Sequence, residues 1–179
     1  MTVVSVMVMV GALAGCGAGG SNPSGGNPGS GNPGSGNPSG SNSPGSTAAQ
    51  ASCAAANAAM INAALGTQVG DPKEQKVGHG VMCQYAPVGG GPGNVVLRIQ
   101  TDVTRAAFDQ ARATSDNSGL PTTDLPGFED AAYTSTISAL SVTTNTVVAL
   151  HGTIEILVSA QASFDAEKAL EQQIFAELV

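Results

Sequence analysis

Two histidines and two of the three cysteines are the side chains whose types could form a metal site. His79 lies four residues before Cys83, whereas Cys53 and His151 are distant in the chain. A zinc site needs three or four such ligands, and these residues could supply them only if both thiols stayed reduced. The alternative is a disulfide between the cysteines, with each histidine in a loop or turn. We favour this alternative and predict no metal ligand and no cofactor.

The adjacent carboxylates Glu129 and Asp130 are the other candidates for chemistry. Neighbouring side chains of a strand point to opposite faces, whereas a two-carboxylate hydrolase needs both groups at one site, ~5–9 Å apart. We therefore expect both to be solvated. The sequence has no Gly-x-Ser-x-Gly elbow and no His-Glu-x-x-His motif. We predict no catalytic residue, and the alternative is a hydrolase that uses carboxylates or His151.

A glycine-rich loop, residues 89–93, has the composition of a phosphate-binding loop but not its context. Phosphate loops lead into a helix whose N–H groups point at the anion. Here the glycines precede the alternating apolar run 95–99, which is typical of a strand. The loop therefore indicates a hairpin connection.

The N-terminal residues have the pattern of an export signal. The apolar run Val3–Ala14 fits the ~7–15 residues of such a signal and is shorter than the ~20 that span a bilayer. It ends in Leu13-Ala14-Gly15-Cys16, which resembles the bacterial lipoprotein lipobox. That resemblance implies that residues 1–15 are removed as a signal peptide and that the Cys16 thiol carries a diacylglycerol. No Lys or Arg precedes the run, which departs from the usual basic start.

Residues 16–49 are predicted to be a disordered tether rich in Gly, Asn, Pro and Ser. Asparagine recurs every five residues, at Asn22, Asn27, Asn32, Asn37 and Asn42. Such a segment has little to bury and cannot offset its ordering entropy. As a flexible coil it spans ~30 Å, and it reaches about 110 Å when extended.

Residues 50–179 are long enough for one domain with a core. All six basic and thirteen acidic side chains lie at or after Asp71, so this domain carries the net charge of −7. An acidic domain without Trp is a poor partner for a phosphate backbone, so we exclude nucleic acid. An exported compartment also favours a disulfide between Cys53 and Cys83.

Hydrophobic periodicity predicts the order helix, two strands, helix, three or four strands, helix. Short strands joined by turns imply an antiparallel sheet. We predict an α+β fold in which about five strands are covered on one face by helices. In the closing helix, Glu167, Glu171 and Glu177 are expected to be solvated. The predicted elements are helices at 51–65, 104–114 and 165–178, strands at 81–85, 95–100, 133–136, 139–143, 146–151 and 153–159, loops at 67–80 and 116–124, and turns at 144–145 and 152.

Several short motifs of the domain resemble those of one group of proteins. They are Cys53 opening the first helix, Leu65-Gly66 at its end, the Gly80-x-x-Cys83-x-Tyr85 strand, Leu125 to Tyr133, and an Ala/Leu-rich closing helix. Together they resemble actinobacterial, mycobacterial-type envelope lipoproteins with a small α+β domain of unknown function. The resemblance implies a disulfide between the two domain cysteines, and it brings no catalytic residues.

These features predict a lipoprotein held at the extracytoplasmic face of the cell membrane through Cys16. We expect a non-enzymatic binding or accessory module of the envelope, whose ligand is another envelope protein or an apolar small molecule. The alternatives are the envelope hydrolase and a metal or redox module using the Cys and His residues.

Overall fold

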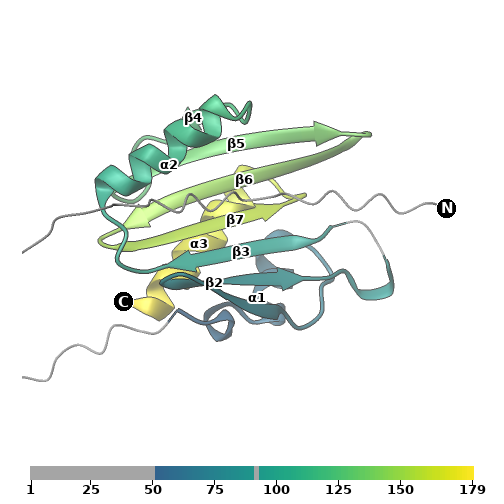
Figure 1. Cartoon of the computed structure of the whole chain (residues 1–179). Coiled ribbons are helices and arrows are strands. Elements are labelled where there is room, and N and C mark those ends of the chain that lie inside the picture. Colours follow the sequence, from purple (N-terminus) through teal and green to yellow (C-terminus); the bar gives the residue numbers. More distant parts are fainter. Residues whose placement is uncertain (1–50, 91–92) are drawn as a thin grey trace, which may run out of the picture. The chain divides into compact units, whose positions relative to one another are not determined.

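The computed structural model describes residues 51–90 and 93–179 (Figure 1). The predicted signal peptide, the Cys16 lipid site and the predicted tether lie outside the described residues. Within the described residues, no helix is long and apolar enough to cross a membrane. The elements are the 3-10 helices η1 (Cys53–Ala56) and η2 (Val88–Gly90), the helices α1 (Ala58–Leu65), α2 (Arg105–Asn117) and α3 (Phe164–Leu178), and the strands β1 (Lys73–Val77), β2 (Gly80–Tyr85), β3 (Val95–Gln100), β4 (Thr122–Asp124), β5 (Ala131–Ala139), β6 (Val142–His151) and β7 (Ile154–Ala160).

The strands form one antiparallel sheet in the order β1-β2-β3-β7-β6-β5-β4, which confirms the α+β class. The sheet has seven strands rather than about five. The two additional strands, β1 and β4, are its edges and lie in segments predicted to be loops. β1 consists mostly of exposed charged and polar residues, and β4 has three residues. Short or charged strands are typical of protected sheet edges, and they leave little hydrophobic alternation to detect.

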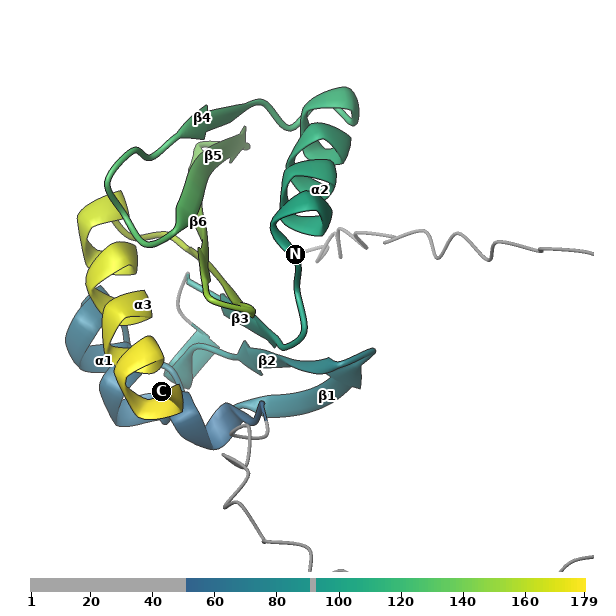
Figure 2. The same cartoon turned by 90° about the vertical axis from the view of Figure 1, so that its left-hand side faces the viewer.

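Helices cover both faces of the sheet, so the prediction of one covered face is wrong (Figure 2). α1 and α3 pack over the face that includes Ala132, Ala149 and Ile156, in the main core. α2 packs its Phe108 on the opposite face, against Tyr133, Val148 and Leu150. The reason lies in β6, where residues 147–150 are all buried. Because successive side chains of a strand point to opposite faces, this apolar run needs cover on both sides.

Polar side chains set the helix boundaries. The predicted helix at 51–65 is divided, because the Asn57 side chain accepts a hydrogen bond from the Met60 N–H and caps α1 separately from η1. Thr104 caps α2 and Ser163 caps α3 in the same way. Short polar side chains at such positions satisfy backbone N–H groups that have no partner within the helix.

The hairpin between β5 and β6 turns at Leu140-Ser141, and the turn predicted at residues 144–145 is wrong. Thr144 and Asn145 instead pair with Ile137 and Thr136 inside the ladder. Leu140 and Ser141 have φ values of 51° and 68°, a conformation that favours Asn and Gly in two-residue hairpin turns. A Leu-Ser pair therefore carries no turn signal in the sequence.

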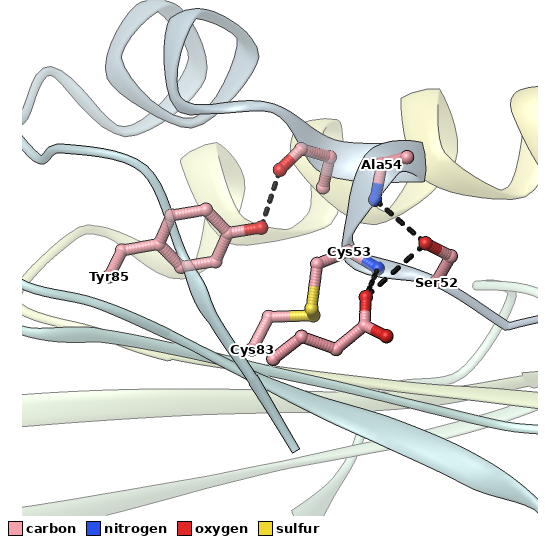
Figure 3. Close-up of a disulfide and its surroundings, with 7 residues drawn as sticks. Ser52, Cys53, Ala54, Cys83 and Tyr85 are labelled. Atoms are coloured by element: carbon pink, nitrogen blue, oxygen red, sulfur yellow. Dashed lines mark hydrogen bonds between the residues drawn. A yellow bond between two sulfur atoms is a disulfide. The ribbon is translucent and has the colours of Figure 1, made fainter. Parts of the chain in front are cut away.

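A disulfide joins Cys53 of η1 to Cys83 of β2, the pairing that the sequence predicted (Figure 3). The Cα atoms are 5.7 Å apart and the cysteines are 30 residues apart in the chain. Glu74 of β1 supports the same junction, because its carboxylate accepts the Cys53 N–H at 2.9 Å. The buried Tyr85 hydroxyl donates to the Ala56 carbonyl. These contacts hold the N-terminal segment against β1 and β2.

We predict that the Cys53→Ala/Cys83→Ala double variant lowers the free energy of unfolding by ~3–4 kcal/mol, the chain-entropy value for a loop of this length. Urea unfolding followed by circular dichroism measures the change. Because both cysteines are replaced, no unpaired thiol complicates the comparison. A loss below about 1 kcal/mol would contradict a stabilising function of this disulfide.

Candidate functional site

The described structure brings one histidine and one carboxylate together where β6 turns into β7. His151 Nδ1 lies 2.9 Å from Glu129 Oε2, and the next carboxylate, of Asp130, accepts the Gly152 N–H at 2.6 Å. Glu129 and Asp130 were expected only to be solvated. Asp130 is exposed, as expected, and also binds the β6–β7 turn, whereas Glu129 is only 16% exposed.

The loop before β5 positions Glu129. Its Phe128 side chain is buried in the main core, and the Asp130 N–H donates to the Leu150 carbonyl. Glu129 itself has a φ of 50°, which is uncommon for a residue other than glycine. The ring of Phe175, from α3, lies 5.6 Å from the His151 ring between centroids. The imidazole is therefore held by a carboxylate and an aromatic ring.

This geometry orients the histidine in the way that a general base requires. A carboxylate at Nδ1 favours the tautomer that carries its proton there and leaves Nε2 as the basic nitrogen. Nucleophilic catalysis also requires a hydroxyl or thiol within hydrogen-bond reach of that base. Within the described chain, no Ser, Thr or Cys side chain is hydrogen-bonded to His151.

The second histidine is separate from this pair. His79 lies in the β1–β2 turn, where its Nδ1 is 3.3 Å from Asp102 Oδ2 and both side chains are largely exposed. Cys53 and Cys83 are joined to each other, so the alternative of a zinc site using both thiols is wrong. Among the described residues, no group of three or more His, Cys, Asp or Glu is arranged to hold a metal ion.

Two carboxylates of α3 are completely buried against the sheet, which corrects the prediction that they are solvated. Glu167 and Glu171 are each 0% exposed, while Glu177 is exposed as predicted. None of their four carboxylate oxygens has a hydrogen-bond partner. Their spacing explains the burial, because residues 167, 171 and 174 follow the helical repeat that places Ile174 in the core.

Burial raises the pKa of Glu167 to about 8. Burial also raises the pKa of Glu171 well above its ordinary value, and the neighbouring carboxylates of Glu167, Glu129 and Glu155 raise it further. Burial therefore favours the protonated, neutral form of both side chains in the folded protein. An uncharged carboxyl is the form that a buried site without a cation tolerates.

The opposite face of the sheet holds a buried ion pair. Glu155 points away from the face that α3 covers, because it lies opposite Gln100 and Leu150. It is nevertheless buried, and its Oε1 lies 2.7 Å from Arg98 Nη2. The guanidinium compensates the carboxylate, which is the usual condition for burying a charge.

A surface depression of about 240 Å³ lies beside α3. Phe128, Asp165, Lys168, Ala169 and Gln172 line it. The Lys168 ammonium and Asp165 carboxylate are 2.7 Å apart on this surface. The lining contains neither His151 nor Glu129, so this depression does not present the histidine–carboxylate pair to a substrate.

Comparisons with known proteins add no further assignment. No family model, no curated protein and no solved structure matches this chain.

We predict that the stability of the fold falls as the pH rises. A carboxyl whose pKa is about 4.5 when unfolded and about 8 when folded stabilises the fold fully below pH 4.5, and this stabilisation is lost as the pH rises to about 8. Each such group contributes a slope of up to ~1.4 kcal/mol per pH unit. Urea unfolding between pH 4.5 and 8.5 measures the dependence.

In the Glu167→Gln/Glu171→Gln variant this dependence should largely disappear, because glutamine stays neutral at every pH. Glu177→Gln is the matched control, since it removes an exposed carboxylate from the same helix and should leave the slope unchanged. A wild-type stability that stays flat across this range would show that the two carboxyls titrate normally.

Proposed function

We propose that this protein is a membrane-anchored extracytoplasmic lipoprotein whose domain, residues 50–179, is a non-enzymatic binding or accessory module of the cell envelope. The observation that carries the proposal is the buried disulfide downstream of the lipobox-like Cys16. Disulfides of this kind persist in oxidising, exported compartments. Cys83 is fully buried and Cys53 nearly so, which supports a structural disulfide rather than a redox centre.

A protein partner in the envelope is better supported than an apolar small molecule. The depression beside α3 combines one aromatic side chain with Asp165, Lys168 and Gln172. Pockets for apolar ligands are lined mostly by apolar side chains. The resemblance to envelope lipoproteins of the mycobacterial type agrees with this proposal, and the anchor would be the diacylglycerol on Cys16, after removal of residues 1–15.

We predict that Cys16→Ser abolishes membrane attachment. In an actinobacterial host, the protein with its natural sequence should incorporate an alkyne-labelled fatty acid and enter the detergent phase of a Triton X-114 extraction. The Cys16→Ser variant should do neither, because two acyl chains are needed for stable anchoring. The Cys53→Ala/Cys83→Ala variant is the control and should still be labelled. A Cys16 peptide whose mass shows no lipid would refute the proposal.

The second candidate function is an envelope hydrolase, and the contact between His151 and Glu129 is the observation that favours it. It predicts hydrolysis of a panel of activated esters and glycosides that His151→Gln and Glu129→Gln both abolish. His79→Gln is the control, because His79 pairs with Asp102 in a different turn. Equal, background-level rates in all four proteins would remove this candidate.

A further inference from the structure

The β5–β6 hairpin extends beyond the rest of the sheet as a two-stranded ribbon (Figure 1). β7 pairs with β6 only from Asn145 onward, and β4 pairs with β5 only up to Ser135. The ladder between β5 and β6 nevertheless continues to Ala139 opposite Val142. The strand residues between 136 and 144 therefore pair only with residues of the same hairpin.

One face and the tip of this ribbon are apolar. Leu140 is 95% exposed, Ile137 44% and Val142 41%. Because Ala139 lies opposite Val142, the two-residue strand period places Ile137 and Val142 on the same face. The other face is polar, and there Ser138 and Thr143 are hydrogen-bonded through their hydroxyls at 3.2 Å.

The ribbon has no charged residue. From residue 131 to residue 154 the chain contains no Asp, Glu, Lys or Arg, although the protein carries a net charge of −7. Exposed strands are usually guarded by lysine, proline or an inward-pointing charge, and this ribbon has none of them. A charged partner would therefore find no complementary group at the tip.

The apolar residue of the turn, Leu140, has an unfavourable backbone conformation. Leu140 has a φ of 51°, which a branched side chain adopts at a cost of ~1–2 kcal/mol. Its 95% exposed side chain gains almost no packing in return. The two-residue hairpin turn imposes this backbone conformation, but neither the turn nor internal packing calls for leucine at this position.

We infer that Ile137, Leu140 and Val142 at the hairpin tip insert into the outer leaflet of the membrane in which the Cys16 lipid is anchored. This inference rests on the proposed function. From Cys16 the chain outside the described domain reaches about 110 Å when extended, whereas a domain of this length has a radius of gyration of ~14 Å. Every face of the domain can thus reach the bilayer, at an effective concentration on the order of millimolar.

A bilayer fits this surface better than a second copy of the chain. Stable protein–protein interfaces bury ~800 Å² on each partner, and three apolar side chains on a narrow ribbon offer far less. A contact made by a tethered domain needs less affinity than one made by a free protein. Burying one leucine side chain already shifts the equilibrium between the membrane-bound and the free domain by roughly 10- to 100-fold. The uncharged tip also lets an acidic domain approach the membrane without bringing a carboxylate into it.

Tryptophan substitution gives a direct test, because the natural chain contains no Trp. The lipidated L140W protein is reconstituted into phosphatidylcholine vesicles whose acyl chains are partly brominated, and bromine quenches an indole that enters the hydrocarbon. The matched control is V179W. Val179 is also apolar and 84% exposed, and it lies at the end of the molecule opposite the tip (Figure 1).

We expect several-fold stronger quenching of the L140W indole than of the V179W indole. Adding Ile137→Ser and Val142→Ser to L140W should reduce the quenching toward the control. Equal quenching of the two indoles in a lipidated, vesicle-bound protein would overturn the inference and leave the lipoprotein proposal intact. An L140W emission that changes with the density of protein on the vesicle but is not quenched by bromine would also overturn the inference. It would indicate that the tip contacts a second copy of the chain. If the protein carries no lipid on Cys16 and does not float with vesicles, both the lipoprotein proposal and the insertion of the hairpin tip are refuted.

Discussion

The fold depends on β7, which pairs with β3 on one side and with β6 on the other. Val158 lies opposite Leu97 of β3 and also opposite Val147 of β6. Without β7, the β1–β3 meander and the β4–β6 group would be separate small sheets. β3 and β7 are more than fifty residues apart in the chain, so the contact that unites the sheet is also costly in loop-closure entropy. The disulfide joins η1 to β2, on the β1–β3 side of this junction.

Local patterns in the sequence predicted the parts of the fold that local interactions determine. The β2–β3 hairpin and a closing helix starting within one residue of Phe164 agree with the structure. The edge strands were missed because β1 and β4 gain their structure by pairing with β2 and β5, not from alternation of their own. The second covered face was indicated by the apolar run at 147–150, which we interpreted as a strand of a two-layer fold.

The candidate site was less predictable, because it depends on tertiary contacts and on environment. No spacing rule places Glu129 beside His151, since the contact depends on the loop that Phe128 anchors. The buried pair is a different case, because the helical spacing of Glu167 and Glu171 did signal burial. Residue type led us to expect solvation, although a carboxyl that keeps its proton can occupy a core position. The fold thereby gives up stability at high pH and tolerates unsatisfied oxygens beneath α3.

The long β5–β6 hairpin gives the molecule two chemically different ends. At one end Ala131 lies opposite Leu150, next to the turn where Glu129 and Asp130 meet His151 and Gly152. At the other end Ala139 lies opposite Val142, next to the apolar tip. Eight residue steps of strand separate the ends by about 27 Å. If the tip is in the bilayer, the end that carries the histidines and their carboxylate partners faces away from it. Under the proposed anchoring, a partner that approaches from the side away from the bilayer would meet the charged end first, so the anchor and the hairpin together would determine which surface is left for recognition.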